Sequence, residues 1–204
     1  MLLRFISKSR LVLLFGLLFF VFNINAAVTV DNTTSNGAFN AAGVAGLTWS
    51  HQVGNGDGKA LFVGVSTSTT TLPIGVPTDR VASVTFNGVP LTRVGTVVSS
   101  DFLNTTEIFR LVNPQNGNHP VVVTLAAVPV VGNPFVNYVV GGAISLHGVN
   151  QATPNGSFFS STGNSNMPTV IVTDSVSGDL VLDTLAVSPN ALFVAPDPNQ
   201  TERW

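Results

Sequence analysis

Short runs rich in Val, Thr, Ile and Phe, separated by Gly, Pro, Asn and Asp, continue from residue 27 to the end of the 204-residue chain. Runs of this kind predict β-strands joined by turns, and no segment has the apolar spacing of an amphipathic helix. About nine strands at such short spacing predict an all-β fold, an antiparallel β-sandwich of the jelly-roll or immunoglobulin-like kind. The expected strands are residues 47–53, 59–66, 81–86, 89–98, 105–112, 120–127, 136–147, 169–173 and 179–187.

Three local patterns add detail to this fold. Residues 59–66 are apolar on both faces, which indicates a central strand that is covered on each side. Asn87-Gly88 lies between two β-rich runs and favours a type I′ turn, because both central positions of that turn take positive φ. Gly141-Gly142 lies in the middle of an expected strand and indicates either a bulge or a close approach of another segment.

The first 26 residues have the order of a signal peptide. Basic residues precede an apolar run of 12 residues at Leu11–Phe22. This run is shorter than the roughly 20 residues of a membrane-spanning helix, and the small residues after it predict cleavage after Ala26 or Ala27. An uncleaved anchor is the alternative. We therefore expect a secreted, extracellular or cell-surface protein with no membrane span after cleavage.

The composition excludes several classes of function. Only 9% of the residues are charged, and the eight Lys and Arg residues are scattered. They cannot form the basic track that nucleic acid binding requires, so we expect no nucleic acid partner. The chain has no cysteine, which excludes disulfides and thiolate chemistry. The stability of an exported domain must then come from its apolar core.

Seven short motifs follow one another along the chain. They are residues 49–54, 60–66, 84–92, 107–111, 142–146, 148–151 and 178–183. In this order the motifs resemble a β-sandwich module of bacterial secreted and cell-surface, adhesin-like proteins. The resemblance covers roughly residues 47–204 and implies an exported module, often part of a larger surface protein, with no catalytic residues.

The resemblance also divides the chain. We expect a signal peptide at 1–26, an N-terminal segment at 27–46 and the β-sandwich domain at 47–204. Modules of this kind continue past the stretch that ends in Trp204 into further strands, so we expect the domain to be C-terminally truncated. Missing strands would leave an open sheet edge through which the protein could associate with itself.

The residue inventory gives little support for catalysis. Glu107 and Glu202 are the two glutamates, and neither has the nearby carboxylate partner of a glycosidase. We expect Glu107 to form a surface charge pair with Arg110. No Gly-x-Ser-x-Gly motif occurs, and alternation places His51 among core residues rather than as a catalytic base. A dispersed Ser-His-Asp arrangement stays open, but we assign no catalytic residue.

Candidate binding residues lie in turns and loops. Asn55 and Asp57 could ligate calcium, although turn chemistry is favoured and no other metal or cofactor is expected. Phe158, Phe159 and His147 are candidate ligand-binding residues. Other aromatic residues that could stack on a sugar ring, but that we expect in the core, include Trp49 and Tyr138.

Three functions follow, in order of preference. The first is an exported structural or adhesive β-sandwich module without catalytic activity, whose partners are other surface-protein domains or extracellular glycans. The second is a carbohydrate-binding module. The third is a secreted hydrolase with dispersed catalytic residues.

Overall fold

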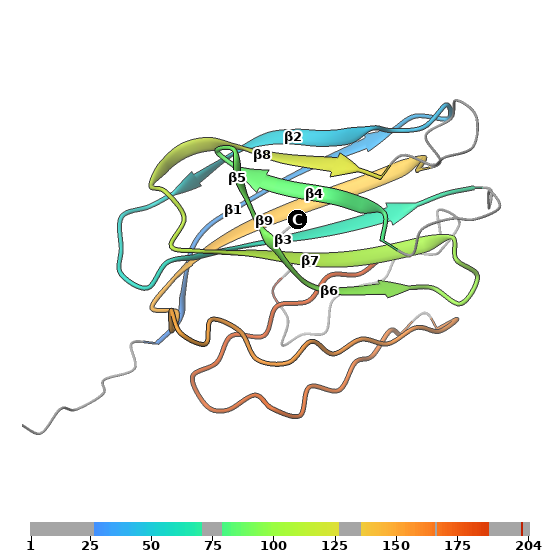
Figure 1. Ribbon diagram of the computed structural model, residues 1–204. Helices are drawn as coiled ribbons and strands as arrows, with labels where there is room; N and C mark the ends of the chain where they lie inside the picture. The colour runs from blue at the N-terminus through green and yellow to red at the C-terminus, as the bar shows by residue number, and fades with distance from the viewer. Residues whose placement is uncertain (1–26, 71–78, 127–135, 166, 188–200, 202–204) are drawn as a thin grey trace, which may run out of the picture.

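The structure, a computed structural model, is an antiparallel β-sandwich (Figure 1). The described residues are 27–70, 79–126, 136–165, 167–187 and 201. None of them is helical, and nine strands lie within these ranges. The expected signal peptide lies outside the described residues, as does Trp204. Within the described residues, no helix is long and apolar enough to cross a membrane.

The nine strands form two sheets, which confirms the expected fold class. One sheet has five strands in the order β1-β9-β3-β7-β6, and the other has four in the order β2-β8-β4-β5. The strands are β1 (Thr29–Phe39), β2 (Gly46–Val53), β3 (Ala60–Ser68), β4 (Val81–Phe86), β5 (Val89–Pro90), β6 (Thr92–Val98), β7 (Asn104–Val112), β8 (Gly117–Leu125) and β9 (Tyr138–His147).

The main core lies between the two sheets. Alternation along β3 turns Leu61, Val63 and Val65 into this core, where they are buried with residues of both sheets. Trp49 of β2 packs there against Gly141 of β9, and a Cβ atom on that glycine would lie 2.7 Å from the indole ring. The glycine therefore allows the close approach that the sequence predicts, and no register shift occurs at this point of β9.

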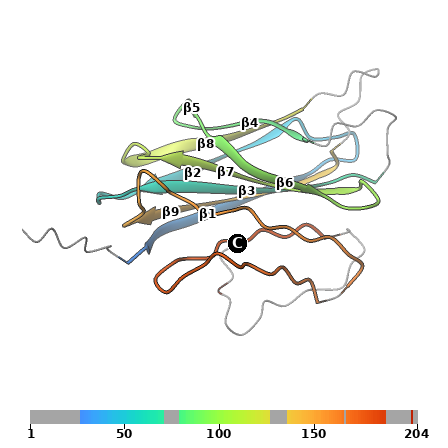
Figure 2. The ribbon, with the colours of Figure 1, turned by 60° about the horizontal axis from the view of Figure 1, so that its bottom comes forward.

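Part of the other face of the five-stranded sheet is also covered. Residues 150–165 and 167–187, which we call the cover segment, run along this face without joining either sheet (Figure 2). Leu182 of the cover segment packs on a second buried cluster that includes Phe62 and Ile144. Apolar side chains on both faces of β3 are thus buried, as expected for a central strand.

The turn at Asn87-Gly88 has the expected backbone. Asn87 has φ 49° and Gly88 has φ 76°, and the turn joins β4 to β5. The expected strand 89–98 is divided, because β5 pairs in the four-stranded sheet while β6 pairs with β7 in the other. Leu91, between them, donates its N–H to Val84 O and is the point where the chain passes from one sheet to the other.

The N-terminal segment 27–46 is part of the sandwich, contrary to the expected division of the chain. It contains β1, which pairs with β9 along its whole length at the edge of the five-stranded sheet. The strand is rich in Thr, Asn, Ser and Gly and lacks the apolar alternation by which the other strands were predicted.

The two strands expected at 169–173 and 179–187 are wrong. The turn between them forms, because Asp179 donates its N–H to Val176 O and accepts a hydrogen bond from the N–H of Val176. Neither side of the turn pairs in a sheet. Exposed and half-buried residues still alternate over 181–187, since this part lies against a sheet face instead of extending a sheet edge.

Candidate functional site

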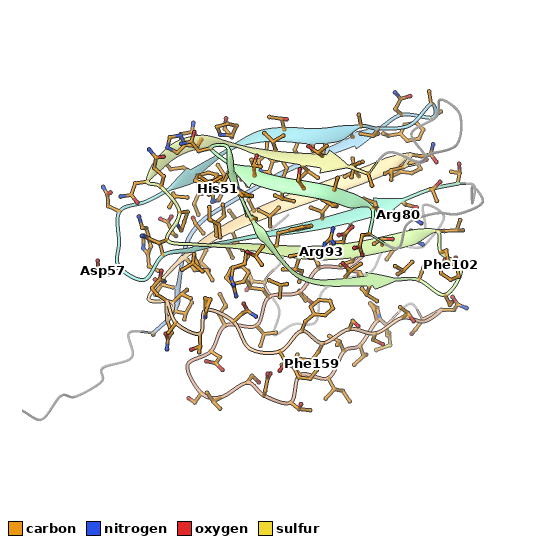
Figure 3. All side chains as sticks on the ribbon, in the orientation of Figure 1. His51, Asp57, Arg80, Arg93, Phe102 and Phe159 are labelled. Carbon is orange, nitrogen blue, oxygen red and sulfur yellow. The ribbon has the colours of Figure 1, made fainter. Side chains whose placement is uncertain are left out.

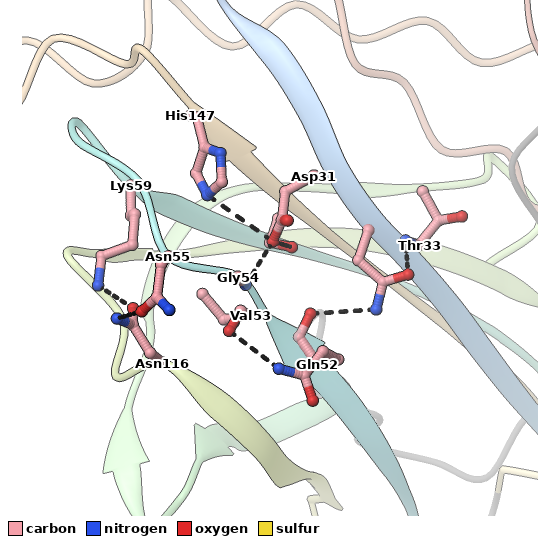
Figure 4. A network of polar contacts seen from close by, with 11 residues as sticks. Asp31, Thr33, Gln52, Val53, Gly54, Asn55, Lys59, Asn116 and His147 are labelled. Carbon is pink, nitrogen blue, oxygen red and sulfur yellow. Dashed lines mark hydrogen bonds and ion pairs between the residues drawn. The ribbon is translucent and has the colours of Figure 1, made fainter.

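Asp31 of β1 is the centre of a polar cluster near the ends of β2 and β9 (Figure 4). Its Oδ2 accepts hydrogen bonds from the N–H of Gly54 at 2.8 Å and from Ser145 Oγ at 2.7 Å. His147 Nε2 lies 3.9 Å from the same oxygen. A bulge in β1 at Asp31 shifts the register against β9, and bulges commonly redirect a side chain in this way.

The surroundings of Asp31 favour the ionised form of its side chain over the protonated form. Burial raises the pKa of Asp31, but the hydrogen bonds from Gly54 and Ser145, with the charges of His147 and His51, bring that pKa below its ordinary value. Asp31 therefore stays ionised and ties three strands together.

Ser145, His147 and Asp31 are the residue types of a catalytic triad, but their arrangement differs from one. In a triad the serine donates to the histidine, and the histidine donates to the aspartate. Here Ser145 is buried and donates directly to Asp31. The hydrogen bond of the hydroxyl therefore goes to the carboxylate and not to the imidazole of His147, to which a triad serine would donate.

His51 lies in the interior beside this cluster. Its Nδ1 is 2.8 Å from Thr34 Oγ1, which also accepts a hydrogen bond of 3.0 Å from Trp49 Nε1. The ring is fully buried, more deeply than the sequence suggested, and packs edge-on to Phe86 at 6.3 Å between centroids. Burial lowers the pKa of His51 to about 4, with partial opposition from Asp31. His51 is therefore a neutral core residue at neutral pH.

Side chains of β1 also bond to the backbone of β2 in the other sheet. Asn32 Nδ2 donates to Gln52 O, and Asn36 Nδ2 donates to Thr48 O, each at 3.0 Å. Both carbonyls belong to β2, an edge strand. The amides of β1 thus supply hydrogen bonds that a neighbouring strand would otherwise supply, and they join the two sheets on this side of the sandwich.

The expectation for Glu107 is wrong. It does not pair with Arg110 at the surface, because Glu107 is fully buried and accepts hydrogen bonds from the N–H groups of Arg80 and Val81 at 2.9 and 2.8 Å. Its other oxygen lies 2.9 Å from Arg93 Nε. Burial raises the pKa of Glu107, with opposition from the Val81 N–H and the Arg93 charge. Figure 3 shows Arg93 by β6 and β7 and Arg80 where β4 begins, both away from His51.

The candidate calcium ligands belong to a hydrogen-bonded turn. Asn55 Oδ1 accepts a hydrogen bond from Asn116 Nδ2, while Lys59 Nζ donates to Asn116 Oδ1 (Figure 4). The carbonyl of Asp57 accepts the N–H of Gly148. These contacts place an ammonium group beside the amide oxygens, and within the described ranges no group of three His, Cys, Asp or Glu residues could hold a metal.

The candidate ligand-binding residues do not form one site. The ring of His147 lies against Gly56, where a Cβ atom would be 2.7 Å from the imidazole, so His147 packs beneath the turn that contains Asn55. The ring of Phe158 covers Gly95 of β6, and Phe158 and Phe159 are half-buried. Figure 3 places Phe159 well apart from Asp57.

One exposed feature, a pair of stacked aromatic rings, is not predicted by the sequence. Phe39, at the end of β1, stacks on Tyr138, at the start of β9, with 4.4 Å between ring centroids and 27° between ring planes. Phe39 is 60% exposed. Tyr138 was expected in the core, but it is half-buried on the outer side of the sheet. The pair depends on the register of β1 and β9, which the sequence does not reveal.

Comparison with known proteins gives no match: no family model, no curated protein and no solved structure matches this chain. The function must therefore be argued from the residues themselves. In the described part of the chain, the ionisable groups Asp31, His51 and Glu107 contact two or more strands from inside the fold. Among the large apolar residues of the described ranges, Phe39 is 60% exposed and Ile171 is 74% exposed.

Proposed function

We propose that the protein is an exported structural or adhesive β-sandwich module that acts outside the cell or at its surface and has no catalytic activity. The proposal that the protein is exported rests on the order of basic, apolar and small residues within 1–26. Its partners would be other surface-protein domains or extracellular glycans.

The observation that carries this proposal is the placement of two kinds of side chain. The ionisable groups that catalysis could use hold strands together, as Asp31 and Glu107 do. Large apolar side chains stand exposed on the cover segment, among them Ile171, which is 74% exposed. Exposed apolar groups gathered on one segment are typical of a surface that binds another molecule.

A specific observation favours sugar binding as the second candidate function. The stacked rings of Phe39 and Tyr138 offer an exposed aromatic surface, and aromatic residues with one apolar face and a polar edge suit contact with amphipathic ligands. The hydrolase candidate has less support, because the hydroxyl of Ser145 is buried and bonded to a carboxylate.

Export and adhesion can be tested on the full chain. Expression with a C-terminal tag in a bacterial host should give an exported product whose mass corresponds to cleavage after Ala26 or Ala27. The purified product, labelled with a fluorophore, should bind to whole bacterial cells or to their extracted surface polymers.

Two results would contradict the proposal. The first is a product that keeps its N-terminal residues and stays in the cytoplasm. The second is an exported product that binds no cell or surface polymer at micromolar concentration, while its thermal unfolding shows a folded protein.

A further inference from the structure

The aromatic pair of Phe39 and Tyr138 stands on the outer face of the five-stranded sheet. Odd-numbered residues of β9 point into the sandwich, because Val139 and Ala143 belong to the main core and Gly141 meets Trp49. Side chains alternate along a strand, so Tyr138 and Val140 lie on the outer face. Their partners in β1 are Phe39 and Gly37.

The surroundings of the pair are held rigidly by one buried side chain. Asn137, next to Tyr138, donates from Nδ2 to Ala41 O at 3.1 Å, in the turn that follows Phe39. Its Oδ1 accepts hydrogen bonds from the N–H and Oγ1 of Thr70 at 3.0 and 3.2 Å. The backbone continues this contact, since Asn40 N–H donates to Asn137 O. Both rings therefore lie next to backbone that is fixed before any ligand binds, which reduces the entropic cost of binding.

The side chains on the outer face beside the pair are small and uncharged, and that of Ser35 carries a hydroxyl group. Ser35 and Gly37 of β1 are exposed there, and Val140 of β9 is 49% exposed. Across β9, Ser66 of β3 donates its hydroxyl to Leu185 O of the cover segment, which marks the border of this face. We call the surface of Ser35, Gly37, Phe39, Tyr138 and Val140 the aromatic platform.

The chemistry of the aromatic platform selects its ligand. None of its five residues is Asp, Glu, Lys, Arg or His, so it offers no ion pair to an anionic polymer. Its rings present apolar faces, and the hydroxyls of Ser35 and Tyr138 can donate and accept hydrogen bonds. A pyranose ring has the matching pattern, with an apolar C–H face and hydroxyls at its edge. We infer that the aromatic platform binds neutral extracellular polysaccharide, with a sugar ring stacked against the Phe39–Tyr138 pair.

This inference rests on the proposed adhesive function and names the ligand class and residues for it. The test uses affinity electrophoresis of the mature protein in gels that contain soluble β-glucan, xylan, galactomannan or starch, with alginate as an anionic comparison. Phe39→Ala is the test variant. Phe102→Ala is the matched control, because Phe102 is a similarly exposed phenylalanine, at 53%, in the loop between β6 and β7.

The expected result is retardation by at least one neutral polysaccharide and weaker retardation by alginate. Phe39→Ala should weaken binding about tenfold, the loss expected for one aromatic contact, while Phe102→Ala should bind as the wild type does. Both variants should unfold at the wild-type temperature, because each ring is mostly exposed.

Other outcomes overturn the inference and separate it from the proposed function. Equal binding by wild type and Phe39→Ala would place the sugar site elsewhere. Binding to cells or surface proteins, without retardation by any neutral polysaccharide, would reject the aromatic platform as a sugar site and keep the adhesive function. Dimerisation of the wild type that Phe39→Ala abolishes in analytical ultracentrifugation would assign the platform to a second copy of the chain. Failure to bind cells, surface polymers and polysaccharides would reject both.

Discussion

The carboxylate of Glu107 lies 2.9 Å from the guanidinium Nε of Arg93 inside the sandwich. Glu107 belongs to β7 of the five-stranded sheet, and its other oxygen accepts the N–H groups of Arg80 and Val81, where β4 of the four-stranded sheet begins. Arg93 also reaches outward to Asp79, at 2.7 Å. One buried carboxylate thus joins the two sheets on the side opposite to the β1–β2 contacts.

Removal of this carboxylate should destabilise the fold severely. Glu107→Ala would leave two buried N–H groups without their acceptor and Arg93 without its buried partner, so we expect a loss of about 3 to 5 kcal/mol. Asp79→Asn is the control, because Asp79 meets the same arginine from an exposed position and should cost less than about 1 kcal/mol. Urea unfolding at neutral pH measures both, and equal losses would contradict the structural role of Glu107.

His51 should make the fold sensitive to acid. Burial in the fold lowers its pKa to about 4 from the ordinary histidine value of 6.5. Below pH 6.5 the unfolded chain binds a proton that the folded chain does not bind until about pH 4. The contribution of His51 is therefore complete above pH 6.5 and falls by about 3 kcal/mol as the pH drops through this window.

Chemical unfolding between pH 4 and pH 7 measures this contribution. His51→Gln should remove the contribution of His51 to the pH dependence of the unfolding free energy. Burial raises the pKa of Glu107, so that residue has the opposite effect, lowering stability as the pH rises above 4.5. If the unfolding free energy depends on pH in the same way in His51→Gln as in the wild type, the acid sensitivity does not come from His51.

The contact of Trp49 with Gly141 should not tolerate a methyl group. Gly141→Ala would place its Cβ 2.7 Å from Trp49 Cη2, inside the contact distance, so we expect a loss of about 1 to 3 kcal/mol. Gly163→Ala is the control, because no atom lies within 4 Å of the position its Cβ would take. Thermal unfolding that shows no difference between the variants would mean that β2 and β9 do not meet as described.

The inward side chains of the cover segment should help to hold it against the sheet. Leu182 packs on the second buried cluster, whereas the adjacent Val181 is 56% exposed. Leu182→Asn should therefore speed hydrogen exchange in residues 179–187 and cost about 1 to 2 kcal/mol. Val181→Asn should leave exchange unchanged. Faster exchange in the Val181 variant than in the Leu182 variant would reverse the assignment of the two faces.

The sequence predicted elements whose signal is local. The turn at Asn87-Gly88 and the double burial of β3 depend on nearby residues, and both are confirmed. The strand expected at 179–187 has the correct alternation, but the edges of the five-stranded sheet are β1 and β6, and this segment pairs with neither. Competition between segments for a sheet edge is a tertiary effect that a local pattern does not contain.

The features that the sequence did not place correctly also have specific physical explanations. Alternation alone puts Glu107 on the same face as Phe109, a core residue, whereas the general rule that charged side chains are exposed predicts a surface position. The strand β1 was missed because its contacts with β2 come from asparagine side chains. The pairing of Phe39 with Tyr138 requires the register of two strands that are distant in sequence.

We propose that the ionisable side chains inside the sandwich hold the fold and do not catalyse a reaction. Hydrolysis of a panel of chromogenic esters and glycosides by wild type and Ser145→Ala tests it most directly. We predict background rates for both proteins, because Ser145 is buried and donates to Asp31. Turnover by the wild type that Ser145→Ala abolishes, with unchanged circular dichroism, would contradict the claim.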